Sequence, residues 1–200
     1  IEPHNPKPPI LLVTATSLFV GHDAAINIMR RILQSSGAEV IHLGHNRAVQ
    51  EIVACAIQED VQGIAITSYQ GGHLEYLKYM YDLVQQAKQQ IKIFAGGGGT
   101  ILPSEIEELH AYGIDRIYSP DDGRQLGLQG MINHLLEACD FPTTHPQTDI
   151  QQLANGGLAG RDPQAIGKLL STAENQPQID VSAAVSAPQG TLPPVLGITG

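Results

Sequence analysis

The first two thirds of the chain alternate short apolar runs with longer segments whose apolar residues recur at helical spacing. Five apolar runs predict strands at residues 10–14, 39–43, 63–67, 92–95 and 116–118, and several are apolar on both faces, as buried parallel strands are. The intervening segments predict helices at residues 24–35, 49–59, 74–89, 104–112 and 125–138. This regular alternation indicates repeated βα units.

Five βα units with right-handed crossovers predict an α/β fold. We expect a flavodoxin-like, doubly wound, five-stranded parallel sheet. Such sheets bind ligands outside the carboxyl ends of their strands, where the strand order reverses. The loops that merit inspection are therefore those that follow the strands, at residues 15–23, 44–48, 68–73, 96–102 and 119–124.

The composition changes after residue 140, where Pro, Thr, Gln and Gly replace the apolar periodicity. We expect an N-terminal extension at residues 1–8, a ligand-binding domain at 9–140, and a linker at 141–194 with a short helix at 162–171. Residues 195–200 read as the beginning of another strand. We therefore expect the chain to be a fragment of a longer protein.

The charge balance argues against several classes of partner. Eleven Lys and Arg residues against 20 Asp and Glu give a formal net charge of -9, which repels nucleic acid and anionic membranes. We expect neither nucleic acid nor a membrane as partner. Cys55 and Cys139 are the two cysteines, so neither a disulfide framework nor a cysteine-based zinc site is indicated, and we expect a cytoplasmic location.

The loop after the first strand ends in Gly21-His22-Asp23, directly before a predicted helix. It can be read as a helix-entry turn in which Gly21 gives backbone freedom, Asp23 caps the helix and His22 lies on the surface. It can also be read as a metal site, because a neutral imidazole on a rigid turn coordinates transition metals. The residues by themselves leave both readings open.

The loop after the third strand carries two hydroxyls and two glycines. Thr67 and Ser68 end the strand, and Gln70 and Gly71 lead into the next helix. The glycines are compatible with a simple helix start. They are equally compatible with a heterocycle that approaches the backbone while Thr67 or Ser68 hydrogen-bonds to it.

The loop after the fourth strand has four consecutive glycines, Gly96, Gly97, Gly98 and Gly99, followed by Thr100. Each glycine costs about 0.5–1 kcal/mol relative to alanine, so four of them indicate that something lies against this backbone. A phosphate-binding P-loop is excluded, because the Lys and hydroxyl that it requires are missing, and no G-x-G-x-x-G follows the first strand. A bulky flat ligand remains.

Together, the loops at residues 21–23, 67–73 and 96–99 resemble the signature loops of the B12-binding domain of the methylmalonyl-CoA mutase family. The resemblance covers residues 9–139. The segments Ser17-Leu18-Phe19, Gly71-Gly72-His73 and 96–100 are most similar to the branch in which isobutyryl-CoA mutase is fused to its G-protein chaperone. Residues 195–200 resemble the truncated start of that G-domain.

The resemblance implies that adenosylcobalamin is the cofactor, bound base-off with His22 as the lower axial ligand of the cobalt. Thr67 is then the first choice for a contact to the nucleotide tail, and Ser68 the second. The implied cofactor-binding residues are Gly21, His22, Asp23, Thr67, Ser68, Gln70, Gly71, Gly96, Gly97, Gly98, Gly99 and Thr100. No catalytic residue is implied, because the cofactor supplies the radical chemistry.

Three positions depart from the family pattern. The family's D-x-H-x-x-G falls on residues 20–25, so Val20 replaces the carboxylate that orients the histidine, and Ala25 replaces the last glycine. Tyr69 replaces a leucine. Loss of a partner that orients a ligand costs about 10- to 100-fold in metal affinity or activity, so we expect weakened binding.

The resemblance further implies that the chain is the cofactor module of an acyl-CoA mutase, an isomerase that performs radical 1,2-rearrangements of the isobutyryl-CoA/butyryl-CoA type. Its partners would be the substrate barrel and the G-protein domain of a homodimeric parent, and the fragment alone would be inactive. A cobalamin carrier or sensor without mutase activity is the alternative. A receiver-type regulatory domain would need an acidic cluster after the first strand, and residues 10–16 contain no acidic residue.

Overall fold

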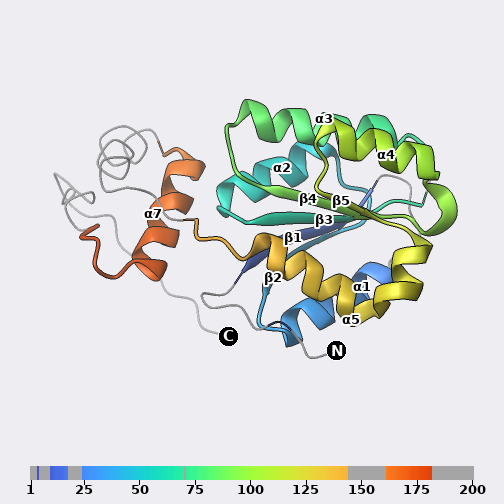
Figure 1. Ribbon diagram of the computed structural model, residues 1–200. Helices are drawn as coiled ribbons and strands as arrows, with labels where there is room; N and C mark the ends of the chain where they lie inside the picture. Colours follow the sequence, from blue (N-terminus) through green and yellow to red (C-terminus); the bar gives the residue numbers. More distant parts are fainter. Residues whose placement is uncertain (1–3, 5–9, 18–23, 70, 144–160, 182–200) are drawn as a thin grey trace, which may run out of the picture. The chain divides into compact units, whose positions relative to one another are not determined.

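The computed structural model describes residue 4 and residues 10–17, 24–69, 71–143 and 161–181. The chain divides into two units, Ile1–Thr143 and Thr144–Gly200. In the first unit, five parallel strands alternate with helices along the chain (Figure 1).

The strands form one sheet in the order β2-β1-β3-β4-β5, and every neighbouring pair is parallel. This is the flavodoxin-like arrangement, so the predicted fold class is confirmed. The order reverses between β1 and β3, which pair from Leu12 with Gly63 to Thr16 with Thr67. The strands are β1 (Leu11–Thr16), β2 (Glu39–Gly44), β3 (Gly63–Thr67), β4 (Lys92–Gly96) and β5 (Arg116–Tyr118).

Helices cover both faces of the sheet. In Figure 1, α1 and α5 lie on one face, and α2, α3 and α4 lie on the other. Each face has its own apolar core, one including Leu12, Phe94 and Leu136, the other Val13, Ile64 and Leu77. The helices are α1 (Ala24–Ser35), α2 (Val49–Gln58), α3 (His73–Gln86), the 3-10 turn η1 (Gly98–Thr100), α4 (Pro103–Tyr112) and α5 (Pro120–Cys139).

Helix α5 begins five residues before its predicted start at residue 125. The reason is local: the Ser119 hydroxyl accepts a hydrogen bond from the backbone N–H of Asp122 at 3.1 Å, and Pro120 fits the first turn. The helix is then interrupted at Gly127, where φ is 65° and ψ is 174°. It therefore consists of two helical pieces.

The described part of the second unit contains helix α7 (Pro163–Asn175), whose first turn is capped by Asp162 through a 3.2 Å hydrogen bond from the N–H of Gln164. The short helix predicted at residues 162–171 is present and continues for four more residues. The expected domain boundaries stay predictions, and the expected G-domain start at residues 195–200 lies outside the described residues. Every helix that the structure describes is too short or too polar to cross a lipid bilayer.

Candidate functional site

A cavity of about 390 Å³ lies against the sheet face that α1 and α5 cover. It reaches the carboxyl ends of β3, β4 and β5, the edge at which sheets of this topology bind ligands. The lining residues come from α1 (Ala25, Ile26, Ile28, Met29, Leu33), β3 and its loop (Ala65, Ile66, Thr67, Tyr69), β4 and its loop (Phe94, Ala95, Gly96, Gly97, Gly98), and β5 with α5 (Tyr118, Ser119, Pro120, Gly123, Leu128, Met131, Leu135).

The walls of this cavity are mainly apolar. Ile28 of α1 and Leu128 of α5 line it although 52% and 38% of their surfaces are exposed, so apolar side chains also meet solvent there. Cavities of this size and character bind small molecules through largely apolar walls, with a few polar groups that fix the orientation of the ligand.

Thr67 places one polar group in the wall of this cavity. Its side chain lines the cavity and is 7% exposed, and its Oγ1 has no hydrogen-bond partner within the described part of the chain. The backbone oxygen of Thr67 is occupied, because it accepts a 2.9 Å hydrogen bond from the N–H of Ser17. An unpaired buried hydroxyl costs about 1–3 kcal/mol, so Oγ1 is suited to a hydrogen bond with a ligand.

Ser68 is placed differently from its neighbour. Its hydroxyl accepts a 3.1 Å hydrogen bond from the Ser17 hydroxyl, and its backbone N–H donates to the oxygen of Gly96 at 2.9 Å. The side chain is buried away from the cavity lining. Ser68 therefore joins the loops after β1, β3 and β4 to one another.

The glycines after β4 are present for different reasons. A Cβ at Gly97 would lie 2.0 Å from the Ser68 oxygen, and Gly98 has a positive φ of 56°. At Gly96 a Cβ would meet no atom closer than the Tyr118 oxygen at 3.8 Å, and at Gly99 it would meet none within 4 Å. Packing within the chain thus explains Gly97, and backbone conformation explains Gly98. Gly96 has room for a side chain and faces the cavity.

A side-chain contact between a buried histidine and a partly exposed glutamate links helices α3 and α4, which follow β3 and β4. His73 begins α3, and its Nε2 lies 3.0 Å from Glu105 Oε2 of α4. The same carboxylate oxygen accepts a 2.7 Å hydrogen bond from the N–H of Leu102. The hydrogen bond from Leu102, followed by that from His73, lowers the pKa of Glu105 against the opposing effect of burial. Glu105 therefore stays a carboxylate in this position.

The structure brings four of the sequence-predicted residues together in the cavity lining: Thr67, Gly96, Gly97 and Gly98. Ser68, Gly71, Gly99 and Thr100 belong to the same loops but do not line it. Gly21, His22, Asp23 and Gln70 lie outside the described residues. Among the described residues, no group of three or more His, Cys, Asp or Glu side chains is placed to hold a metal ion.

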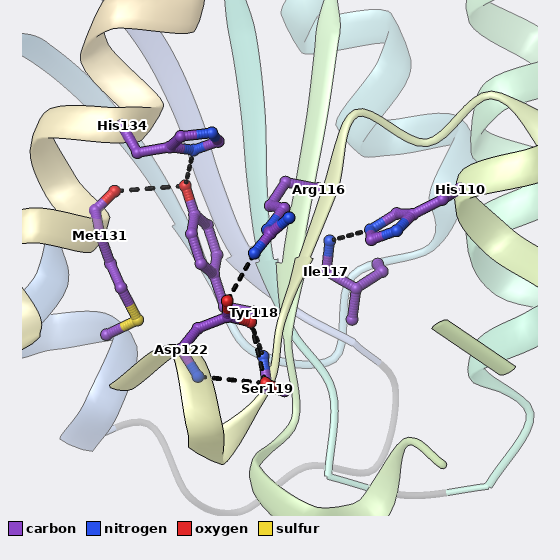
Figure 2. A network of polar contacts seen from close by, with 8 residues as sticks. All are labelled: His110, Arg116, Ile117, Tyr118, Ser119, Asp122, Met131 and His134. Atoms are coloured by element: carbon purple, nitrogen blue, oxygen red, sulfur yellow. Dashed lines mark hydrogen bonds and ion pairs between the residues drawn. The ribbon is translucent and has the colours of Figure 1, made fainter. Parts of the chain in front are cut away.

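Sequence reasoning missed the contribution of β5 and α5. Four residues of this region line the cavity: Tyr118, Ser119, Pro120 and Gly123. The loop at residues 119–124 contains no recognisable motif from which their role could be predicted. The sequence indicated only that this loop follows the fifth strand and therefore lies at the edge of the sheet where ligands bind. The Tyr118 hydroxyl donates to the Met131 oxygen at 3.2 Å and lies 2.9 Å from His134 Nδ1 (Figure 2). Burial raises the pKa of Tyr118, so the phenol stays protonated.

Asp122 holds the turn that leads from β5 into α5. One carboxylate oxygen accepts hydrogen bonds from the N–H and the hydroxyl of Ser119, at 2.8 and 2.9 Å. The other lies 2.5 Å from Arg116 Nη2 (Figure 2). Although burial by itself would raise the pKa of Asp122, the contacts from Ser119 and Arg116 lower it below its usual value.

Comparison with known families assigns the segment that contains all five strands of the sheet. The model of the B12-binding domain matches residues 10–123. The chain belongs to the B12-binding domain family. The domain described above is accordingly a cobalamin-binding domain, and the cavity lies within its matched segment and the helix that follows.

The chain that contains this B12-binding domain is also similar to named enzymes. The chain is 57% identical to "Fused isobutyryl-CoA mutase" of Geobacillus kaustophilus over 98% of this chain and 19% of the relative. Identity to the protein of the same name from Cupriavidus metallidurans is 53%, over 98% of this chain and 18% of the relative. The chain therefore spans about a fifth of the length of these relatives. It is also 32% identical to the "Pivalyl-CoA mutase small subunit" of Xanthobacter autotrophicus, over 60% of this chain and 78% of that one.

A solved structure supports the fold independently. A cobalamin-binding protein from Desulfitobacterium hafniense superposes with a TM-score of 0.53 at 19% identity, covering 66% of this chain and 60% of that one. At this identity the likeness concerns the architecture of the B12-binding domain.

Proposed function

We propose that the chain binds adenosylcobalamin base-off, with the nucleotide tail in the cavity between α1 and α5 and with His22 as the lower axial ligand of the cobalt. The observation that carries this proposal is the Thr67 hydroxyl, buried in an apolar cavity without a partner in the described chain. The tail of cobalamin has a flat aromatic base and polar groups along its sugar and phosphate. An apolar cavity with an unpaired hydroxyl suits both parts.

Two further features fit the same ligand. Gly96 faces the cavity, and the surrounding atoms would leave room for a side chain at this position. Because glycine has none, a ligand in the cavity can approach the Gly96 backbone closely. Gly123 faces the cavity from the first turns of α5, and a Cβ there would meet no atom within 4 Å. Each glycine leaves space beside the cavity that the fold itself does not use.

His22 belongs to the segment between Ser17, the last described residue after β1, and Ala24, the first of α1. Both ends of this segment are therefore at the ligand edge of the sheet. A neutral imidazole there would donate a lone pair to cobalt, and its other nitrogen would require a hydrogen-bond acceptor. Val20 provides none, so affinity would be lower than with an aspartate at that position.

The enzyme that this module serves would be an acyl-CoA mutase of the isobutyryl-CoA/butyryl-CoA type. The similarity to fused isobutyryl-CoA mutases along nearly the whole chain supports this assignment. Adenosylcobalamin, when bound, supplies the radical for a 1,2-rearrangement of the carbon skeleton. The residues of this chain hold the tail, bury its base and exclude water. The substrate barrel and the G-protein domain would belong to the remainder of a homodimeric parent chain.

An absorption titration tests the proposal. The chain is titrated with adenosylcobalamin and with cobinamide, the corrinoid that lacks the nucleotide tail. Burial of the base in the cavity should contribute about 1.5–3 kcal/mol, so cobalamin should bind about 10- to 100-fold more tightly than cobinamide. The bound spectrum should be base-off and His-on, and His22→Ala should remove the His-on signature.

Two results would contradict the proposal. Equal affinity for cobalamin and cobinamide would show that the cavity does not take the tail. A spectrum at saturating protein that is identical to that of the free cofactor would show that no histidine replaces its base.

A further inference from the structure

The α5 side of the cavity is built from two helical pieces rather than one continuous helix. Gly127, with its non-helical backbone, separates residues 120–126 from residues 128–139. Pro120 and Gly123 line the cavity from the front piece, and Met131 and Leu135 line it from the rear piece. Because the backbone leaves the helical conformation between the pieces, the position of the front piece does not follow from that of the rear one.

The rear piece is fixed by packing and by Tyr118. Ile132, Leu135 and Leu136 are at most 1% exposed in the apolar core. The Tyr118 hydroxyl adds its hydrogen bond to the Met131 oxygen across the sheet edge (Figure 2). This piece is therefore anchored whether or not a ligand is present.

The front piece has no comparable apolar anchor, because none of residues 120–126 belongs to the buried core. Its anchor is polar. The Asp122 carboxylate accepts two hydrogen bonds from Ser119 and forms the 2.5 Å ion pair with Arg116 of β5, and only 16% of the Asp122 side chain is exposed. Together these contacts fix the first turn of α5 on the end of β5.

We propose that Asp122 is a positioning residue for cofactor binding, which holds the α5 front piece at the distance from the sheet that the nucleotide tail requires. This inference rests on the proposed function, because it presupposes that the cavity receives the tail. Asp122 itself does not line the cavity. It acts through Ser119, Pro120 and Gly123, which do.

The adjacent carboxylate provides a matched control. Asp121 is in the same helical turn, and its side chain is 69% exposed. Within the described part of the chain it pairs with Arg124, a neighbour on the same turn that is 73% exposed. Asp121→Asn therefore makes the same chemical change one residue away without touching the connection to β5.

The experiment measures dissociation constants for cobalamin and cobinamide with the parent chain, Asp122→Asn and Asp121→Asn, together with thermal unfolding of each. Partners that orient ligand-holding groups contribute about 10- to 100-fold. We expect Asp122→Asn to lower the preference for cobalamin over cobinamide by about 10-fold, and Asp121→Asn to leave it unchanged. A general loosening of the fold would weaken both ligands and leave their ratio intact.

Arg116→Gln serves as a second variant if Asp122→Asn does not fold, because it removes the ion pair and keeps both hydrogen bonds to Ser119. It should lower the same ratio by a smaller factor. A ratio within twofold of the parent value in the folded variants overturns the role of Asp122. If the parent chain itself does not distinguish cobalamin from cobinamide, the proposed function fails instead.

Discussion

The backbone oxygen of Ser68 fills the space that a Cβ on Gly97 would need, at a distance of 2.0 Å. The loops after β3 and β4 are therefore interlocked at this point, and the Ser68 N–H strengthens the contact by donating to the oxygen of Gly96. Adjacent glycines in one run thus have separate purposes. Gly97 allows two loops to pack, whereas Gly96 keeps the cavity wall open.

Alanine substitutions should separate these purposes. Gly97→Ala should lower the free energy of unfolding by about 1–3 kcal/mol, because its Cβ has to displace backbone. Gly96→Ala should leave stability unchanged or raise it by up to about 1 kcal/mol, and should weaken cobalamin binding. Gly99→Ala is the control, since its Cβ would meet no atom within 4 Å and would not line the cavity.

Chemical denaturation measures the stability of these glycine variants, and cofactor titration measures their affinity for cobalamin. Unchanged affinity in Gly96→Ala would show that the tail does not approach this backbone.

Thr67→Val should change stability and affinity in opposite directions. Valine has nearly the same shape and suits a strand, so removal of an unpaired buried hydroxyl should stabilise the free chain by up to about 1 kcal/mol. Loss of the proposed hydrogen bond should weaken cobalamin binding by about 0.5–1.5 kcal/mol. Ser68→Ala, which removes a hydroxyl paired with Ser17, should instead destabilise the chain. Tighter or equal cobalamin binding by Thr67→Val would exclude the proposed contact.

The fold was predictable because each strand is a short apolar run and each crossover has helical periodicity. The cavity was predictable only in part. Glycines and hydroxyls at residues 67–68 and 96–99 are visible in a sequence, but the choice between Thr67 and Ser68 depends on which hydroxyl Ser17 occupies. The wall from β5 and α5 was missed because apolar residues such as Leu128 and Met131 look like any helix core. The start of α5 was misplaced because its cap depends on the Asp122 network.

Val20→Asp tests the expected weakness of the histidine site. An aspartate that accepts a hydrogen bond from the far N–H of the imidazole fixes the tautomer and makes the other nitrogen a better donor to cobalt. We expect cobalamin to bind more tightly by about 1.4–2.7 kcal/mol, which corresponds to 10- to 100-fold. The same change in a His22→Ala background should have no effect, because no imidazole remains to be oriented. If Val20→Asp does not improve binding, another group already accepts the hydrogen bond from this imidazole N–H.

His110 makes stability depend on pH. Its Nε2 accepts a 2.9 Å hydrogen bond from the N–H of Ile117, which requires the neutral ring. Burial, and then the positive charge of Arg116, lower the pKa of His110 below its usual value. His110 therefore contributes fully to the free energy of unfolding when the pH is above its pKa in the unfolded chain, about 6.5. This contribution is lost as the pH falls through the lowered pKa of the folded chain. His110→Gln keeps an acceptor that does not titrate, so its denaturation free energy should fall less steeply below pH 6.5. An identical slope in parent and variant would rule out this linkage.

The hydrogen bond between His110 and Ile117 also protects the border of the sheet. Strand β5 is three residues long and has a strand neighbour, β4, on one side only. Exposed edge strands offer unpaired N–H groups to which another chain can add a strand, and short edges with occupied donors resist this. Because His110 occupies the Ile117 N–H only while its ring is neutral, acidification would remove this protection. Acidification would then favour self-association through the β5 edge.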